Sequence, residues 1–331
     1  MKEKQVKPII IGIAGTELTA QEIELFQNHP PLGVILFRRN IKSETITDGL
    51  GEKIQIQDRE QLTNLIGSIK EVLGEHCIIS VDQEGGRVKR LIAPTFKSAP
   101  SAKTFADIAR QEGIDIAVER CKQNYKEIAK ELKELGFNLN FAPVADLRHE
   151  GAHDIIGDRS FGSTPPTVIR LCQAALEGLA EAKVIGCIKH IPGHGRATKD
   201  SHKALPSVEA SLEELEKTDF YVFKELAILP VSKLAMTAHI IYKALDPDNP
   251  ATLSKKVINY IREEIGFKGL IISDAIEMKA LSGGMADITE KAFAAGIDIV
   301  LECSGNFDNM TAVLGAAPAC GVENFSELFI G

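Results

Sequence analysis

Short runs of apolar and β-branched residues recur along the chain, and each run is followed by a longer segment with helical periodicity. The runs predict strands at residues 8–14, 33–37, 77–81, 137–141, 184–188, 234–238, 269–272 and 297–301. Amphipathic stretches predict helices between them, among others at residues 115–135, 167–182, 211–228 and 254–265. Strands that alternate with helices pair in parallel through right-handed crossovers. Eight such units predict one α/β domain, a (β/α)8 TIM-like barrel over residues 1–331.

Ionisable residues lie at or soon after the ends of six of the predicted strands. They are Asp82, Asp146, Lys189, His190, His239, Asp274 and Glu302. A strand has to end in something polar, but that explanation covers one or two cases more easily than six. Because a barrel builds its active site from the C-terminal ends of its strands, these residues predict an active site at that end.

Composition and charge narrow the classes of protein that the chain can belong to. The formal net charge of −8 argues against nucleic acid or an anionic membrane as a partner. No apolar run reaches the roughly eighteen residues of a transmembrane helix, and the one near the N-terminus is too short for a signal peptide. The six cysteines lack CxxC spacing, which favours free thiols in a reducing compartment. We expect a cytoplasmic protein that binds neither nucleic acid nor membrane, and we expect a monomer.

The segment after the fifth predicted strand is dense in groups that transfer protons. It reads Lys189-His190-Ile191-Pro192-Gly193-His194-Gly195 and continues to Asp200-Ser201-His202. His202 is a candidate acid/base, because an imidazole titrates near neutral pH and Asp200 can fix its tautomer. A metal site at His190 and His194 is the alternative, but the proline and glycine between them prevent the helix that would place both imidazoles on one face.

Two further motifs combine glycines with charged residues. They are Asp82-Gln83-Glu84-Gly85-Gly86-Arg87, with Arg90 soon after, and Gly157-Asp158-Arg159-Ser160-Phe161-Gly162. The first can bring the backbone close to a ligand and hold hydroxyl groups, although a tight turn with a surface ion pair fits equally well. In the second, Arg159 can reach a ligand from a long loop that Phe161 anchors, with a structural Arg–Asp pair as the competing interpretation.

Asp274 follows the seventh predicted strand. Taken alone, Ser273 and Asp274 fit the N-cap of a helix that starts at Ala275. Paired with His202, Asp274 instead supplies the nucleophile of a set that cleaves acetals, in which the second group protonates the leaving oxygen. Most glycosidases use two carboxylates, so here an imidazole tuned by Asp200 would take the second role.

These motifs, in this order, resemble the β-N-acetylglucosaminidases of glycoside hydrolase family 3, and in particular the single-domain cytoplasmic enzymes of peptidoglycan recycling. The matching segments are residues 82–88, 156–161, 189–195, 200–202, 236–239 and 273–274. The resemblance covers nearly the whole chain, and the ordered set carries it rather than any one motif.

The resemblance implies a retaining mechanism without cofactor or metal. Asp274 would attack the anomeric carbon and form a covalent glycosyl-enzyme. His202, on a flexible loop and paired with Asp200, would protonate the leaving group and then activate water. The residues that match the sugar-binding positions of the family are Asp82, Arg90, Arg159, Lys189 and His190. The implied small-molecule substrate is a muropeptide in which N-acetylglucosamine is β-1,4-linked to 1,6-anhydro-N-acetylmuramic acid.

The chain departs from the family pattern in two places. Many relatives carry two aspartates where this chain has Asp274 and Ala275, and since the first is the nucleophile, the chemistry is retained. The tail after Leu314 is weakly patterned and leaves the closing helix of the barrel unassigned.

Two alternative functions stay open. An N-acetyl-β-glucosaminide phosphorylase is one, because an imidazole acid/base tolerates an incoming phosphate dianion better than a glutamate does. A non-catalytic sugar-binding protein on the same barrel is the alternative of another class.

Overall fold

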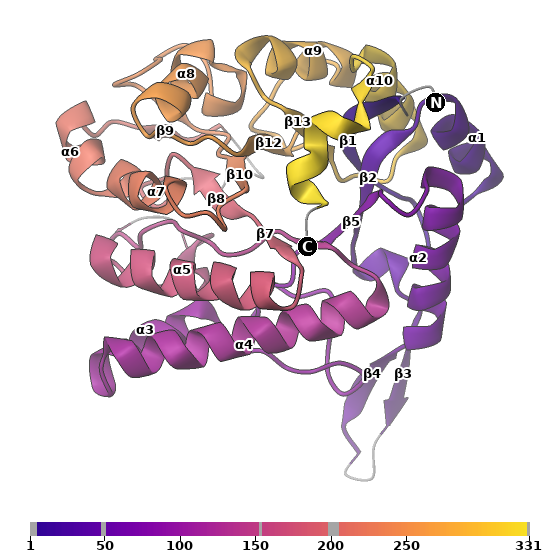
Figure 1. Ribbon diagram of the computed structural model, residues 1–331, viewed down its shortest axis with the longest axis horizontal. Coiled ribbons are helices and arrows are strands. Elements are labelled where there is room, and N and C mark those ends of the chain that lie inside the picture. The colour runs from indigo at the N-terminus through magenta and orange to yellow at the C-terminus, as the bar shows by residue number, and fades with distance from the viewer. Residues whose placement is uncertain (1–4, 48–50, 152–153, 198–204, 330–331) are drawn as a thin grey trace.

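A ring of parallel strands surrounded by helices forms the body of the molecule (Figure 1). The computed structural model describes residues 5–47, 51–151, 154–197 and 205–329. In order around the ring, the strands are β1 (Gln5–Gly12), β2 (Pro31–Leu36), β5 (Ile78–Val81), β6 (Leu139–Asn140), β7 (Ile185–Gly186), β8 (Ile188–Ile191), β10 (Leu234–Thr237), β12 (Leu270–Ala275) and β13 (Ile299–Glu302). Because only Cys187 separates β7 from β8, these two act as one strand, and the described residues form the predicted eight-stranded barrel.

Residues along each strand alternate between the two sides of the barrel wall. In β1, Ile9 and Ile11 pack with the surrounding helices, whereas Ile10 packs inside the barrel. In β2, Val34 faces the helices and Ile35 faces the interior in the same way. The interior is therefore a packed apolar core, and the polar residues at the C-terminal strand ends form a separate layer at its mouth.

The helices cover the outside of the barrel. They are α1 (Ala20–Asn28), α2 (Arg59–Leu73), α3 (Ala102–Gln111), α4 (Ile114–Leu135), α5 (Pro165–Glu181), α6 (Leu212–Lys217), α7 (Asp219–Ala227), α8 (Lys255–Glu263), α9 (Met285–Ala295) and α10 (Phe307–Ala316). Local signals set their ends: α2 begins after Asp58, whose carboxylate accepts from the backbone N–H of Gln61 at 2.9 Å. It ends at Gly74, which has a φ of 90°.

The helix predicted at residues 211–228 is two helices. The chain breaks at Thr218, whose φ of −128° and ψ of −93° are not helical. The break places the buried Asp219 at the start of α7, where its carboxylate accepts from Arg196 at 2.7 Å. The ion pair between Arg196 and Asp219 thus fixes the helix break at Thr218, although the sequence periodicity predicts one continuous helix.

The tail that the sequence left unassigned closes the bottom of the barrel. After α10, strand β14 (Cys320–Gly321) pairs antiparallel with the start of β1, and a 3-10 helix follows at Val322–Leu328. The amine of Lys7 donates to the carbonyl of Ala317 at 2.6 Å, which ties the two ends of the described chain together.

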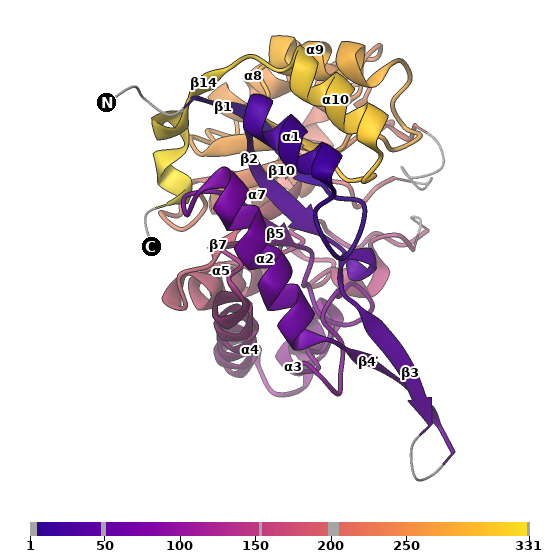
Figure 2. The ribbon, with the colours of Figure 1, turned by 90° about the vertical axis from the view of Figure 1, so that its right-hand side faces the viewer.

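Two strand pairs lie outside the barrel. A hairpin of β3 (Ser43–Thr47) and β4 (Lys53–Gln57) extends from the body as an arm (Figure 2). Strands β9 (Ser207–Val208) and β11 (Ile241–Tyr242) form a short parallel pair. The sequence patterns predicted neither pair.

Two expectations from composition can be compared with the structure. All six cysteines are free, as their spacing predicts, and five of them are buried. Among the described residues, no helix has both the length and the apolar character that a membrane crossing requires.

Candidate active site

A cavity of about 590 Å³ lies at the C-terminal ends of the barrel strands. Its lining includes the six predicted site residues that the structure describes, Asp82, Arg90, Arg159, Lys189, His190 and Asp274. Asp82 follows β5, Lys189 and His190 belong to β8, and Asp274 belongs to β12. The strand-end pattern of the sequence therefore identifies residues that the fold brings into one cavity.

Asp82 is held between two cations. Its Oδ1 accepts from Lys189 Nζ at 3.0 Å, and its Oδ2 accepts from Arg90 Nη2 at 3.0 Å. Burial alone would raise the pKa of Asp82, but the charges of Lys189 and Arg90 outweigh burial and hold this pKa well below its usual range. Asp82 is thus a fixed anion that orients both cations toward the cavity.

Glu84 is a site residue to which the sequence interpretation gave no role of its own. Both of its oxygens accept from Arg159, Oε2 from Nε and Oε1 from Nη2, each at 2.8 Å, and Oε1 also contacts Lys189 Nζ at 2.7 Å. The residue is 5% exposed. Burial opposes ionisation, but Arg159 and Lys189 outweigh it and lower the pKa of Glu84 to about 2. Glu84 therefore fixes the guanidinium plane of Arg159 and the position of the Lys189 amine, two groups that the resemblance assigns to sugar binding.

The two glycines after Glu84 serve packing rather than approach to a ligand. Gly85 and Gly86 have φ values of +98° and +56°. A Cβ on Gly85 would collide with the carbonyl oxygen of Pro100, and one on Gly86 would collide with Ser101. The turn thus lies against the start of α3, so the expectation of a close backbone approach to a ligand is replaced by tight packing.

In the loop motif around Arg159, Phe161 packs inward and Arg159 lines the cavity. Phe161 is fully buried beside Phe105 and Tyr125, with ring centroids 6.4 and 6.3 Å away, so it does anchor the loop. Asp158 pairs with Arg87 at 2.8 Å rather than with Arg159. Arg159 instead pairs with Glu84 and lines the cavity.

His190 is oriented by Asp146, a strand-end residue without an assigned role in the sequence interpretation. Asp146 Oδ2 lies 2.7 Å from His190 Nδ1, and Oδ1 accepts the backbone N–H groups of His190 at 3.1 Å and His194 at 2.7 Å. Asp146 is fully buried; burial acts to raise its pKa, but His190 outweighs this and the pKa is lowered. Because an ionised carboxylate only accepts, His190 donates from Nδ1 and keeps Nε2 for another partner.

Asp274 lies at the end of β12, and its surroundings keep it ionised. Burial raises its pKa, but the neighbouring imidazoles of His190 and His239 outweigh burial, so the pKa lies below its ordinary value. Its Oδ1 accepts from the backbone N–H of Ala275 at 2.8 Å. Within the described residues, no donor contacts Oδ2. No helix starts at Ala275, because residues 276–281 form turns and bends and α9 begins at Met285, so the N-cap interpretation is wrong.

His239 holds the strand end that carries Asp274. Its Nε2 lies 3.0 Å from the carbonyl oxygen of Ala275 and its Nδ1 lies 2.7 Å from the hydroxyl of Thr252. Because a carbonyl only accepts, His239 donates from Nε2 to the residue next to Asp274.

Two further carboxyl groups, those of Glu277 and Glu302, lie near Asp274. Glu277, which lines the cavity, accepts from the backbone N–H of Cys303 at 3.1 Å. Burial and then the charge of Glu302 raise the pKa of Glu277 to about 7. Neither carboxyl was assigned a role from the sequence, although Glu302 was recognised as a strand-end residue.

The proposed acid/base group cannot be placed. His202 and Asp200 lie outside the described residues, so the structure tests neither of these two predictions. The described chain stops at Ala197 and resumes at Leu205. In the part of the chain that the structure describes, no group of three or more potential ligands could hold a metal ion.

The chain is similar to known glycosidases over most of its length. A family model described as Glycosyl hydrolase family 3 N terminal domain matches residues 11–322 of this chain. A beta-hexosaminidase of Tolumonas auensis is 37% identical over 302 residues, which cover 90% of this chain and 83% of the relative. A beta-hexosaminidase of Neisseria gonorrhoeae is 36% identical over 300 residues, which cover 90% of this chain and 78% of the relative.

Solved structures show the same likeness. NagZ from Neisseria gonorrhoeae in complex with N-trifluoroacetyl-D-glucosamine superposes with a TM-score of 0.86 at 32% identity, covering 99% of this chain and 91% of that one. A family 3 beta-N-acetylglucosaminidase from Paenibacillus sp. superposes with a TM-score of 0.82 at 30% identity, covering 93% of this chain and 55% of that one.

Proposed function

Because the chain belongs to glycoside hydrolase family 3 and is a glycosidase related to the beta-hexosaminidases, we propose that it is a retaining β-N-acetylglucosaminidase of peptidoglycan recycling. The substrate is a 1,6-anhydro-muropeptide, from which the enzyme releases the terminal β-1,4-linked N-acetylglucosamine. Asp274 is the nucleophile, and His202 with Asp200 is the acid/base. The residues that bind the sugar are Asp82, Arg90, Arg159, Lys189 and His190.

The observation that carries this proposal is the state of Asp274. It is ionised, one of its oxygens has no donor among the described residues, and it shares a cavity with a fixed set of hydroxyl-binding cations. A glycosidase needs such a carboxylate beneath the anomeric carbon, where positive charge develops in the oxocarbenium-like transition state.

The reaction then follows in two steps. Asp274 attacks the anomeric carbon while His202 gives a proton to the leaving oxygen, and the sugar becomes esterified to the enzyme. His202, now neutral, takes a proton from water, which attacks the same carbon and releases N-acetylglucosamine with retained configuration. Lys189 and Arg159 hold the sugar through both steps because Asp82 and Glu84 prevent them from moving.

An aryl N-acetyl-β-glucosaminide tests the proposal directly. The protein should release the aryl alcohol, and Asp274→Ala should lower kcat by roughly a thousandfold or more. A matched control is Asp287→Ala, which removes an exposed carboxylate paired with Lys291 and should leave activity unchanged. Full activity in Asp274→Ala would reject the assignment.

A 2-fluoro or 5-fluoro sugar tests the covalent step. The mass of the intact protein should rise by one glycosyl unit, and the adduct should lie on the peptide that contains Asp274. An adduct on another residue, or inversion of the product's configuration, would contradict the retaining mechanism.

Phosphorolysis is tested in the same assay. If N-acetylglucosamine 1-phosphate forms when phosphate is supplied, the protein is a phosphorylase and not a hydrolase. We expect free N-acetylglucosamine in both conditions. The free cysteines support the proposal of a cytoplasmic protein, and light scattering of the purified protein tests the proposal of a monomer.

A further inference from the structure

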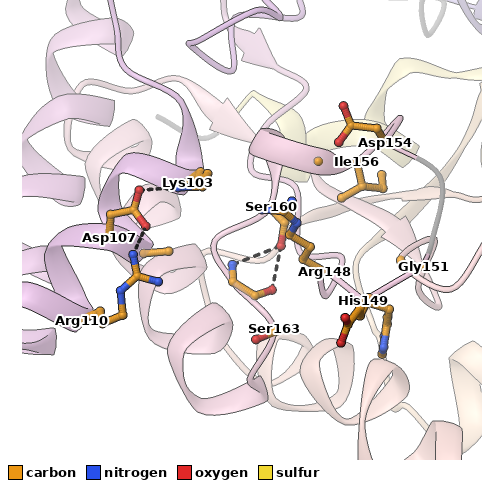
Figure 3. A pocket seen from close by; sticks show the side chains of 15 residues that line it. Lys103, Asp107, Arg110, Arg148, His149, Gly151, Asp154, Ile156, Ser160 and Ser163 are labelled. Atoms are coloured by element: carbon orange, nitrogen blue, oxygen red, sulfur yellow. Dashed lines mark hydrogen bonds and ion pairs between the residues drawn. The ribbon is translucent and has the colours of Figure 1, made fainter.

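A short segment, residues 154–159, separates two cavities. Ile155 and Ile156 line the cavity at the mouth of the barrel, whereas Asp154 and Ile156 line a second cavity of about 460 Å³ beside it. Figure 3 shows Asp154 and Ile156 at the edge of the second cavity, with the charged side chains of α3 on the opposite side. The segment is therefore a thin wall that has a cavity on each side.

Apolar packing contributes little to the position of this wall. Ile156 is 3% exposed, but it belongs to neither of the two apolar core clusters that the described residues form. Phe161 does pack in the core, but it anchors the chain only after the segment has ended. Because a side chain between two cavities lacks packing partners on part of its surface, hydrogen bonds have to set the position of the segment.

One guanidinium, that of Arg87, contacts four of the six residues of the segment. Its Nη2 donates to the backbone carbonyl oxygens of Asp154, Ile155 and Ile156, at 2.6, 2.9 and 3.3 Å. Its Nε lies 2.8 Å from Oδ1 of Asp158. Hydrogen bonds from a charged donor are stronger than neutral ones, so Arg87 holds the backbone of the wall.

A single turn at the end of β5 supplies two holds on this wall. Glu84 pairs with the guanidinium of Arg159, and Arg87, three positions after Glu84, holds the backbone that precedes Arg159. The turn is rigid because Gly85 and Gly86 lie tightly against the start of α3. Arg159 is thus fixed both at its side chain and at its backbone, and a displaced backbone would misplace the guanidinium.

We propose that Arg87 is a positioning residue of the glycosidase, which holds residues 154–159 as the wall of the cavity at the barrel mouth and acts on the sugar through Arg159. This inference rests on the proposed function and deepens it. The competing interpretation is a surface ion pair between Arg87 and Asp158, whose side chains are 44% and 37% exposed. Such a pair contributes little and would leave the sugar unaffected.

A double-mutant cycle with an aryl N-acetyl-β-glucosaminide tests whether Arg87 acts through Arg159. Arg87→Ala should raise KM about tenfold and lower kcat by less, and Arg159→Ala should raise KM about a hundredfold. The double variant should match Arg159→Ala within about twofold, because Arg87 then has no side chain left to position. Losses that multiply in the double variant would mean that the two residues act independently, and the inference would be wrong.

Three further variants separate the carbonyl contacts from the ion pair. Arg87→Lys should recover part of the loss, because its amine keeps the charge and can donate to the carbonyls. Asp158→Asn should raise KM by about twofold or less, because it weakens only the exposed pair. Arg170→Ala, which removes an exposed arginine paired with Asp115, is the control and should change nothing. A loss in Asp158→Asn as large as in Arg87→Ala would refute the hold on the carbonyls.

Hydrogen exchange measured by mass spectrometry tests the hold without any substrate. The peptide over residues 154–161 contains the amides of Arg159 and Ser160, which bond within the segment. In Arg87→Ala this peptide should exchange at least about tenfold faster, while a peptide from α5, residues 165–181, should not change. Unchanged exchange at residues 154–161 would contradict the inference. Faster exchange along the whole chain would show a general loss of stability and would contradict it as well.

The two proposals fail in different ways. If the wild-type protein releases no aryl alcohol, the proposed function is rejected, and the role of Arg87 in the reaction is rejected with it. If the wild-type protein is active and Arg87→Ala has an unchanged KM, only the inference about Arg87 is rejected.

Discussion

The substitution Glu84→Gln tests whether Arg159 and Lys189 are held by a buried ion-pair network or by weak ion pairs of the kind found on the surface. Glutamine keeps the shape of the side chain but replaces one acceptor oxygen with a donor NH₂ group. In the wild type, both oxygens of Glu84 accept from Arg159, and one also accepts from Lys189. The variant therefore places a donor against a donor and leaves Arg159, whose side chain is 11% exposed, without its carboxylate.

The expected loss of stability follows from the pKa of Glu84. A shift from an ordinary value of 4.5 to about 2 corresponds to ~3 kcal/mol in favour of the ionised form. Breaking a buried ion pair by removing one partner costs about 3–5 kcal/mol, because the other charge is left buried and uncompensated. We therefore expect the free energy of unfolding to fall by ~3 kcal/mol near neutral pH.

The pH dependence of this loss has a definite sign. The pKa of Glu84 is lower in the folded protein than in the unfolded chain, so its contribution is fully present above about pH 4.5. The contribution disappears as the pH falls toward 2. The difference in stability between wild type and Glu84→Gln should therefore shrink in acid.

Urea unfolding and kinetics on the aryl substrate measure both consequences. Glu112→Gln is the matched control, because Glu112 makes the same two-fold contact with Arg120, at 2.7 Å for each bond, on the exposed surface. The control should lose less than about 1 kcal/mol. Glu84→Gln should also raise KM roughly tenfold, because Arg159 loses its orientation. Equal small losses in both variants, with an unchanged KM, would refute the reasoning.

The remaining predictions concern the turn, the raised pKa and the orienting carboxylate. Gly85→Ala should destabilise the protein by several kcal/mol more than Gly113→Ala, because both glycines have φ near +100° but only the first has no room for a Cβ, and urea midpoints measure the difference. Glu277→Gln should raise the free energy of unfolding by roughly 1–3 kcal/mol at pH 8 and by little at pH 4. Burial raises the pKa of Glu277 to about 7 in the folded protein, so above the pKa of the unfolded chain its ionisation destabilises the fold. Urea unfolding at both pH values measures this difference. Asp146→Asn should lower kcat about a hundredfold and change the pH profile of kcat, because its amide donates to His190 Nδ1 and selects the opposite tautomer. An unaltered profile would reject that role.

The barrel could be predicted from sequence because parallel strands with helices outside are buried on both faces. Such strands appear as continuous apolar runs, and the run at residues 8–14 corresponds to β1. The hairpin of β3 and β4 lacks this signal because most of its residues are exposed. All residues of β3 are exposed, and the pairing of Ile46 with Ile54 is too short a pattern to be distinguished from a loop.

The candidate site could be predicted in part for a similar reason. Residues at strand ends are visible in the sequence, and six of the predicted side chains do line one cavity. The roles of Glu84 and Asp146 were not visible, because each is defined by a partner far away in the chain. Glu84 meets Arg159 across 75 positions, and Asp146 meets His190 across 44. Sequence spacing carries no information about contacts that only closure of the barrel creates.

Four of the described carboxyl groups line the cavity at the mouth of the barrel, and their surroundings give them different chemistry. Asp82 and Glu84 are ionised, but every oxygen of both accepts from a lysine or an arginine, so their lone pairs are engaged. Glu277, with a pKa of about 7, is largely protonated below neutral pH and is then a poor nucleophile. Asp274 combines ionisation with an oxygen that no described donor contacts. The environment, rather than residue type, therefore supports the proposal that Asp274 is the group that attacks the sugar, as with the differently tuned carboxylates of other glycosidases.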